Sequence, residues 1–215
     1  SDGWTTPYGT NIIGKFTNNN AQKNGGAIAN VSDYAQGSGA PLISTIQSDF
    51  ENNKVISTTD AKGGAIYNTG AITNITADFD NNSVTSIGGN AYGGAIYSGY
   101  ETVNGIYYRG AVSSLESSFT SNFVVSDGIG LGGAIYTANN MNFNVDDSMI
   151  IQGNYVTDSN GTRPNAIFVD TTAGNVVLNF NLTNSAVLNI YDEIDGGNFD
   201  GNTVNRANGT AYNLN

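Results

Sequence analysis

Acidic side chains are the residues of this sequence that could carry acid–base or metal chemistry. The closest groupings are Asp146 with Asp147, and Asp192 with Glu193 and Asp195. Polysaccharide cleavage needs converging carboxylates, as metal ligands or as an acid–base pair, with a basic residue nearby. Adjacent residues of a strand point to opposite faces, so neither grouping is by itself such a site. We expect these acids to be solvated turn residues, and the chain to be no enzyme.

Composition excludes several other chemistries. The sequence contains no Cys and no His, which excludes disulfides, thiol nucleophiles, histidine bases and the usual zinc sites. Asp and Asn oxygens could bind calcium, but no D-x-D-x-D-G loop is present, and we expect no metal and no cofactor. With 7 basic against 18 acidic residues and a net charge of -11, nucleic acid and anionic lipid are poor partners.

A glycine pair recurs along the chain and raises the question of phosphate binding. The copies read GGAIAN at 25–30, GGAIYN at 63–68, GGAIYS at 93–98 and GGAIYT at 132–137. A phosphate-binding glycine loop needs a following helix N-terminus and usually a Lys. Residues typical of strands follow each pair here, so we interpret the glycines as the corners of a repeated structural unit.

A second motif, Phe-x-x-Asn, alternates strictly with the first. Its copies begin at Phe16, Phe50, Phe79 and Phe119, and the last three precede the next glycine pair by 13 or 14 residues. A degenerate fifth copy runs from Ile151 to Phe168. Copies kept in register indicate a structural repeat.

The local pattern favours short strands over helices. No i, i+3, i+4 apolar pattern is sustained, and in residues 71–79 alternation places Ala71, Thr73, Ile75, Ala77 and Phe79 on one face. Strands repeating every 30–39 residues, with Gly and Asn at corners, predict an all-β solenoid with parallel strands about 4.8 Å apart.

Stacking predicts columns of equivalent residues. We expect the motif Phe residues and the motif Ile residues to point inward. We expect their neighbours to form an outward aromatic strip, comprising Ala29, Tyr67, Tyr97, Tyr136 and Phe168. The motif asparagines are expected to form a ladder of amide hydrogen bonds, comprising Asn19, Asn53, Asn82, Asn122 and Asn154.

Two insertions, at 31–43 and 99–112, break the spacing and are the candidate binding loops. Tyr and Arg are favoured at interfaces, so the predicted contact residues are Tyr34, Tyr100, Tyr107, Tyr108 and Arg109. The alternative is that the tyrosines only cover the solenoid.

The repeats divide the chain into three parts. Residues 1–15 form an N-terminal edge, residues 16–173 the repeated turns, and residues 174–215 continuing turns or a C-terminal cap. Because no apolar run reaches about 18 residues and no signal peptide is recognisable, we expect no membrane insertion by this segment. The abrupt start at Ser1 and end at Asn215 lead us to expect a segment of a longer protein.

The alternating Gly-Gly-Ala-Ile and Phe-x-x-Asn motifs over residues 16–168 resemble passenger domains of bacterial autotransporters of the polymorphic outer membrane protein type. The tail from Leu188–Asp192 through Ile194–Gly196 is similar to stretches of other autotransporter passengers. The resemblance implies a right-handed single-stranded parallel β-helix, export through an outer-membrane barrel, and a role in adhesion. Similar repeats occur in other surface β-helix proteins.

The resulting expectation is a non-enzymatic adhesin segment on the cell surface, anchored in the outer membrane or secreted. Its expected partner is a host-cell protein or glycan, or another copy of itself, bound by many weak contacts. A β-helix polysaccharide lyase or hydrolase and a spacer or self-associating stalk are the alternatives.

Overall fold

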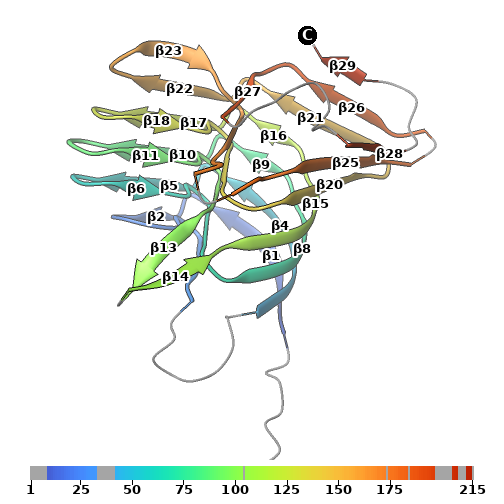
Figure 1. Cartoon of the computed structure of the whole chain (residues 1–215), viewed down its shortest axis with the longest axis horizontal. Coiled ribbons are helices and arrows are strands. Elements are labelled where there is room, and N and C mark those ends of the chain that lie inside the picture. Colours follow the sequence, from blue (N-terminus) through green and yellow to red (C-terminus); the bar gives the residue numbers. More distant parts are fainter. Residues whose placement is uncertain are drawn as a thin grey trace, which may run out of the picture.

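The structure, a computed structural model, describes residues 9–32, 42–103, 105–172, 174–183, 185–196, 205–207 and 212–214. These residues form strands and no helix. Most strands pair in parallel, and the resulting sheets together nearly enclose the core (Figure 1). The chain is therefore all-β over its described part. That part also contains no helix long and apolar enough to cross a lipid bilayer.

The long sheet provides one side of the molecule. Its strands are β1 (Thr10–Thr17), β4 (Leu42–Glu51), β8 (Ala71–Thr76), β9 (Phe79–Asp80), β15 (Ala111–Glu116), β16 (Phe119–Thr120), β20 (Met141–Val145), β21 (Ser148–Gln152), β25 (Leu178–Leu182), β26 (Val187–Ile190), β28 (Asn205–Ala207) and β29 (Tyr212–Leu214).

A second sheet, the isoleucine sheet, faces the long sheet across the core. Its strands are β3 (Ile28–Asn30), β7 (Ile66–Asn68), β12 (Ile96–Ser98), β19 (Ile135–Thr137), β24 (Ile167–Val169) and β27 (Ile194–Asp195).

Two further sheets form a thin wing, whose tips project to the left in Figure 1. The outer wing sheet contains β2 (Asn20–Ala21), β5 (Lys54–Ser57), β10 (Ser83–Ser86), β17 (Phe123–Ser126), β22 (Tyr155–Asp158) and β23 (Gly161–Pro164). The inner wing sheet contains β6 (Ala61–Lys62), β11 (Ala91–Tyr92) and β18 (Gly130–Leu131).

The chain visits the sheets in one order and then repeats it, although only the second to fourth passages enter the inner wing sheet and the described residues of the sixth form no wing strand. We call each passage a layer: residues 10–32, 42–69, 71–98, 111–138, 141–170 and 178–195 form layers 1 to 6. Parallel pairing keeps the layers in register, so Phe50 pairs with Phe79 and Ile66 with Ile96. A hairpin of β13 (Tyr100–Val103) and β14 (Ile106–Arg109) stands outside this order, between layers 3 and 4.

The predicted inward columns are confirmed. Phe50, Phe79 and Phe119 are fully buried and stack face to face, with ring centroids 4.9 Å apart. That separation equals the spacing of neighbouring strands, so one stacked ring fits each layer. The motif isoleucines are buried against them in the same core. At the layer 1 end the core is less covered, and Phe16 is half-buried.

The predicted asparagine ladder is also confirmed. Asn82 Nδ2 donates to Oδ1 of Asn122 in the next layer at 3.0 Å and to the carbonyl of Phe50 in the previous layer at 2.9 Å. Its Oδ1 accepts from the backbone N and the Nδ2 of Asn53. Both amide hydrogens and the carbonyl oxygen are thus satisfied inside the protein. The Phe and the Asn of the motif are linked across layers, because from layer 2 to layer 5 each motif Asn donates to the Phe carbonyl of the previous layer.

Layer 6 ends the ladder with a different residue. Asp192 Oδ2 accepts from the backbone N of Asn154 at 2.7 Å and from its Nδ2 at 2.9 Å, and Asp192 Oδ1 accepts from Gly153 N. A carboxylate offers no N–H to a further layer. The ladder therefore has a direction, with the side-chain donors pointing from each layer to the next as far as Asp192, whose side chain only accepts.

The glycine pair forms the corner between the inner wing sheet and the isoleucine sheet. Gly63 has a φ of 66°, in the left-handed region. At Gly64 a Cβ would lie 2.0 Å from the carbonyl oxygen of Gly94, so the next layer approaches too closely for any side chain. The interpretation of the pair as a structural corner is confirmed.

The expected alternation over residues 71–79 is wrong in its first half. Ile72 is buried and Thr73 is exposed, whereas Ile75, Ala77 and Phe79 are buried as expected. The pairing of β8 with β15 passes over Thr73 and Ser113, and that with β4 passes over Ser44, so β4, β8 and β15 each carry one extra residue there, whereas β20 does not. Such a bulge shifts the inward set by one position.

The wing has a small core of its own and a covered edge. Val55, Val84 and Val124 pack against Ala61 and Ala91 between its two sheets. At the layer 5 edge, β23 folds back antiparallel on β22. Arg163 binds the buried carboxylate of Asp158 through both Nη atoms, at 2.9 and 3.0 Å.

The ladder predicts that adjacent asparagines differ in their tolerance of the same substitution. Asn82→Asp removes both amide donors and buries a charge, and we expect it to lower the free energy of unfolding by about 3 kcal/mol. Asn81→Asp is the matched control. Asn81 is exposed, and we expect a loss below about 1 kcal/mol. Urea unfolding of both variants measures the difference, and equal losses would contradict the role of the ladder.

The Arg163–Asp158 pair predicts a pH dependence of stability. The hydrogen bonds from Arg163 lower the pKa of Asp158 from 3.8 to about 2. Because the folded-state pKa is depressed, the stabilisation is complete above pH 3.8 and is lost as the pH falls through about 2. We expect Arg163→Met to cost about 1–3 kcal/mol at pH 7, and the difference from the parent to shrink between pH 4 and pH 2.

Lys15→Met serves as the control for that measurement, because Lys15 and its partner Glu51 are both largely exposed. It should change the unfolding free energy little at any of these pH values. A difference between Arg163→Met and the parent that stays constant down to pH 2 would rule out the assigned pair.

Candidate interaction surface

The tyrosines that follow the motif isoleucines are buried, so the expected outward aromatic strip is wrong. Tyr67, Tyr97 and Tyr136 are 0%, 4% and 6% exposed. They form a second apolar cluster, the tyrosine column, separate from the main core. At the two ends of the expected strip, Ala29 is exposed and Phe168 is half-buried.

The wing explains this burial. The tyrosines do point away from the main core, as alternation requires, but they enter the angle between the isoleucine sheet and the inner wing sheet. Tyr92 and Leu131 of the inner wing sheet pack against them, and Tyr92 meets the Tyr136 ring edge-on at 5.2 Å. Within the column the rings stack at 5.3 and 5.0 Å, and Lys62 Nζ lies 5.1 Å from the centre of the Tyr97 ring.

Each phenol of the column has a hydrogen-bond acceptor. Tyr67 donates to the Glu101 carboxylate, Tyr97 to the Tyr100 carbonyl at 3.1 Å, and Tyr136 to the Asp170 carboxylate. Burial raises the pKa of Tyr67, Tyr97 and Tyr136 above the ordinary value, and the neighbouring carboxylates raise it further. The column is therefore neutral and structural at physiological pH.

The hairpin of β13 and β14 is fastened to this column. Glu101 on β13 accepts from Tyr67 and lies 3.8 Å from Lys62 Nζ. Tyr100 packs against the column, and its hydroxyl lies 3.3 Å from Thr172 Oγ1. At the base of the hairpin Gly110 N donates to the Gly99 carbonyl at 2.7 Å.

Four of the five predicted contact residues lie on this hairpin, and the side chains of three of them are described. Tyr100 is paired with Arg109 and Glu101 with Tyr108, and Arg109 is exposed while Tyr108 is half-buried. Tyr107 pairs through its backbone with Thr102, but its side chain lies outside the described residues. Tyr34 also lies outside them, as do residues 33–41 of the first insertion.

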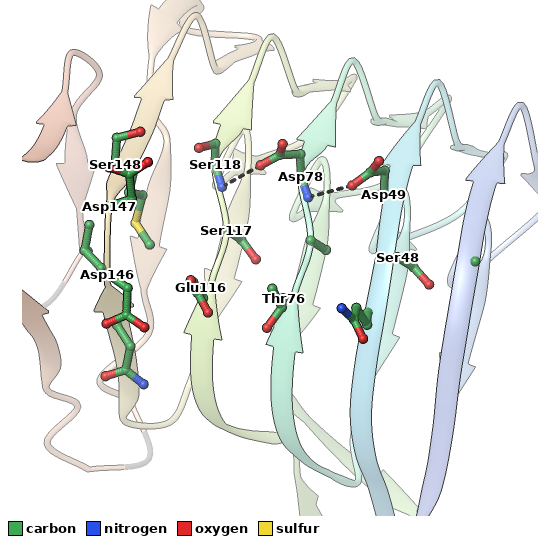
Figure 2. A pocket seen from close by; sticks show the side chains of 16 residues that line it. Ser48, Asp49, Thr76, Asp78, Glu116, Ser117, Ser118, Asp146, Asp147 and Ser148 are labelled. Carbon is green, nitrogen blue, oxygen red and sulfur yellow. Dashed lines mark hydrogen bonds between the residues drawn. The ribbon is translucent and has the colours of Figure 1, made fainter. Parts of the chain in front are cut away.

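A groove on the long sheet brings acidic residues of several layers together. It lies where the strands bend between β8 and β9 and at the equivalent points of other layers, and it has a volume of about 410 Å³ (Figure 2). Five carboxylates line this acidic groove, from Asp49, Asp78, Glu116, Asp146 and Asp147. No Lys or Arg is among the residues that line it.

Two carboxylates of the acidic groove hydrogen-bond neighbouring layers to each other. Asp49 Oδ1 accepts from Asp78 N at 3.5 Å, and Asp78 Oδ1 accepts from Ser118 N at 3.3 Å (Figure 2). Ser48 and Ser117 lie at the bend with buried hydroxyls that have no partner among the described residues. Ser48 alternates with exposed Gln47 and Asp49, which places its hydroxyl on the inner face, away from the acids.

The acids that the sequence singled out do not form one site. Asp146 and Asp147 line the groove, whereas Asp192 ends the asparagine ladder and Asp195 accepts from Asn165 Nδ2 at 3.4 Å. Within the described ranges no cluster of three or more acidic residues could hold a metal ion. The groove itself is a feature that sequence reasoning missed, because its acids come from four layers.

Comparison with known families identifies the repeats. Residues 15–31 and 47–69 match the model of the Chlamydia polymorphic membrane protein (Chlamydia_PMP) repeat. These two segments resemble polymorphic membrane protein repeats. The matched segments contain the Phe-x-x-Asn motifs of layers 1 and 2 and their glycine pairs, so the predicted resemblance to passenger domains of the polymorphic membrane protein type is confirmed. No curated protein and no solved structure was found to match the chain.

The attachment of the hairpin can be tested through Glu101. In Glu101→Ala the Tyr67 phenol loses its acceptor and Lys62 its ion pair, so we expect the hairpin to open more often. Amide hydrogen exchange in residues 100–109 should become about tenfold faster, while exchange in β12 stays unchanged. Glu116→Ala, an exposed acid of the long sheet, is the control and should leave hairpin exchange as in the parent.

Proposed function

We propose that this chain is an adhesive segment of a bacterial cell-surface protein and has no enzymatic activity. In this proposal the stacked layers are turns of a right-handed single-stranded parallel β-helix, and the hairpin is the element that contacts the partner. The observation that carries the proposal is the polymorphic membrane protein repeat over residues 15–31 and 47–69, combined with one ordered insertion that leaves an otherwise regular stack.

Location follows from the repeat at a coarse level. The matched family is named for a membrane protein of Chlamydia, which supports an outer-membrane or surface location for a protein built from the same repeats. The further steps, export by an autotransporter and a role in attachment or virulence, are part of our proposal.

The partner is a host-cell surface protein or glycan, or another copy of the chain. Tyr108 and Arg109 are residue types favoured in interfaces, and the hairpin holds them on a rigid support through Glu101 and Tyr100. A stack of similar layers gains affinity by repetition, since weak contacts on one rigid body add.

The acidic groove favours a second candidate, a β-helix that binds or cleaves polysaccharides. Carboxylates in a groove across a sheet suit sugar hydroxyls. Against cleavage stands the lining of the groove, in which no basic residue accompanies the acids. We therefore rank this candidate below adhesion, and a stalk without its own binding site below both.

A shortened chain tests the proposal. Because Gly99 and Gly110 are already hydrogen-bonded, residues 100–109 can be removed by joining the two glycines. We expect beads coated with the shortened chain to lose most of their binding to epithelial or bacterial cells, with far-UV circular dichroism unchanged.

Tyr108→Ala with Arg109→Ala keeps the hairpin backbone and separates contact from scaffold effects. It should reduce bead binding at least about fivefold, whereas Asp146→Ala with Asp147→Ala in the groove should not. Loss of binding in the groove variant alone, or release of sugars from a polysaccharide by the parent chain, would support the second candidate.

A further inference from the structure

The first layer has a shortened wing. Six positions lead from Asn19 of the ladder to Gly25 at the corner. The same step takes ten positions in layers 2 and 4, and eleven in layer 3. Layer 1 therefore lacks about four residues at the wing tip, and the tip of layer 2 extends beyond it.

The pairing of the strands shows what this shortening leaves uncovered. On one side all four residues of β5 pair with β10, but on the other β2 pairs only with Lys54 and Val55. Ile56 and Ser57 thus have no strand partner on the layer 1 side within the described part of the chain. On the inner wing sheet a single bridge joins Asn24 to Lys62. The opposite edge of the outer wing sheet is covered by β23.

A hollow of about 490 Å³ occupies the place of the missing residues, and we call it the wing step. Its lining comes from the turn of layer 1 and the tips of layers 2 and 3, comprising Gln22, Lys23, Ile56, Ser57, Thr58, Thr59 and Ile87. Unpaired strand edges of this kind are templates for strand addition.

Two exposed isoleucines lie in the wing step. Ile56 is 42% exposed and Ile87 is 57% exposed. Both would gain from contact with an apolar side chain, since removal of apolar surface from water is favourable. The wing step therefore offers an apolar contact beside an open backbone edge.

Among the described residues that line the wing step, the one charged residue, Lys23, is basic. Lys54 shares the outer face of β5 with Ile56. Lys15 and Lys62 are held in ion pairs with Glu51 and Glu101, whereas Lys23 and Lys54 take part in no ion pair among the described residues. In a chain of net charge -11, Lys23 thus offers a positive charge to a ligand in the wing step, while Asp60 lines a neighbouring hollow that Lys23 also lines.

These features together define the ligand. A sulfated glycan would satisfy the lysines but leave the isoleucines and the strand edge uncovered. A neutral apolar peptide would cover the isoleucines but ignore the charge. We propose that the wing step binds an extended, acidic peptide segment of about four residues that carries an apolar side chain and adds a strand beside Ile56 and Ser57. The wing step contains no hairpin residue, so this binding is independent of the proposed function.

Two short peptides of opposite charge test the proposal on the full chain. The probes are fluorescein-labelled hexapeptides, one of alternating glutamate and leucine and one of alternating lysine and leucine, followed by fluorescence anisotropy at low salt. We expect saturable binding of the glutamate peptide, at least about tenfold weaker binding of the lysine peptide, and weakening of the former as salt is raised.

Matched substitutions locate the binding. Lys23→Gln and Ile87→Ser should each weaken binding of the glutamate peptide about five- to tenfold. Lys15→Gln and Ile13→Ser are the controls, because Lys15 lies outside the wing step and Ile13 is a 76% exposed isoleucine on β1. Circular dichroism shows whether each variant keeps its fold.

A variant in which inserted residues fill the wing step is a more stringent test than the single substitutions. Insertion of a copy of residues 56–59 after Ala21 completes the wing of layer 1, and we expect it to abolish peptide binding without lowering the melting temperature. The proposal is overturned if neither peptide binds, if controls and wing-step variants lose equally, if the filled variant folds and still binds, or if heparin binds at Lys23 while the glutamate peptide does not.

Discussion

The hydrogen bond from one asparagine amide to the next is the interaction on which the rest of this molecule depends. Parallel strands alone would tolerate slippage, because backbone groups repeat along every strand. The ladder from Asn19 to Asp192 removes that freedom, since a shift by one residue would leave buried amides without partners. With the register fixed, phenylalanine rings meet at the strand spacing and isoleucines meet isoleucines, so one small motif builds both the corner and the core.

The surface features follow from departures from that regularity. Where successive layers have the same length, their side chains form continuous columns, and the surface that the described residues form there has no large protrusion. Where a layer is longer, the extra residues leave the stack as the hairpin between layers 3 and 4. Where layer 1 is shorter, the tip of layer 2 remains uncovered. The acidic groove arises at the shared bend of the long strands, where equivalent positions of several layers carry acids.

The sequence was sufficient for the parts of the fold that repeat and insufficient for the parts that depend on how the chain folds back on itself. Repetition placed the Phe and Ile columns and the asparagine ladder, because equal spacing forces equal residues into contact. The burial of Tyr67, Tyr97 and Tyr136 could not be read from alternation, which only says that they point away from the main core. The missed signal was the Val55 and Ala61 pair with its counterparts Val84 and Ala91, small residues that mark a thin two-sheet wing. The extra residue at Thr73 was hidden because a bulge leaves no mark on composition.

For the candidate site, sequence reasoning found the hairpin residues through the break in spacing. It did not find their attachment to the tyrosine column, which joins Glu101 to a tyrosine 34 positions away.

The direction of the asparagine ladder has a consequence for how such chains can change over generations. Each interior layer accepts the same asparagine hydrogen bonds from the previous layer that it donates to the next. A duplicated gene segment encoding a whole layer could therefore be inserted between two others without leaving a buried amide unpaired. The junction after Asp192 differs, because the carboxylate there accepts from Asn154 and offers no side-chain N–H to a following layer. Length variation by duplication of whole layers is therefore expected within layers 1 to 5.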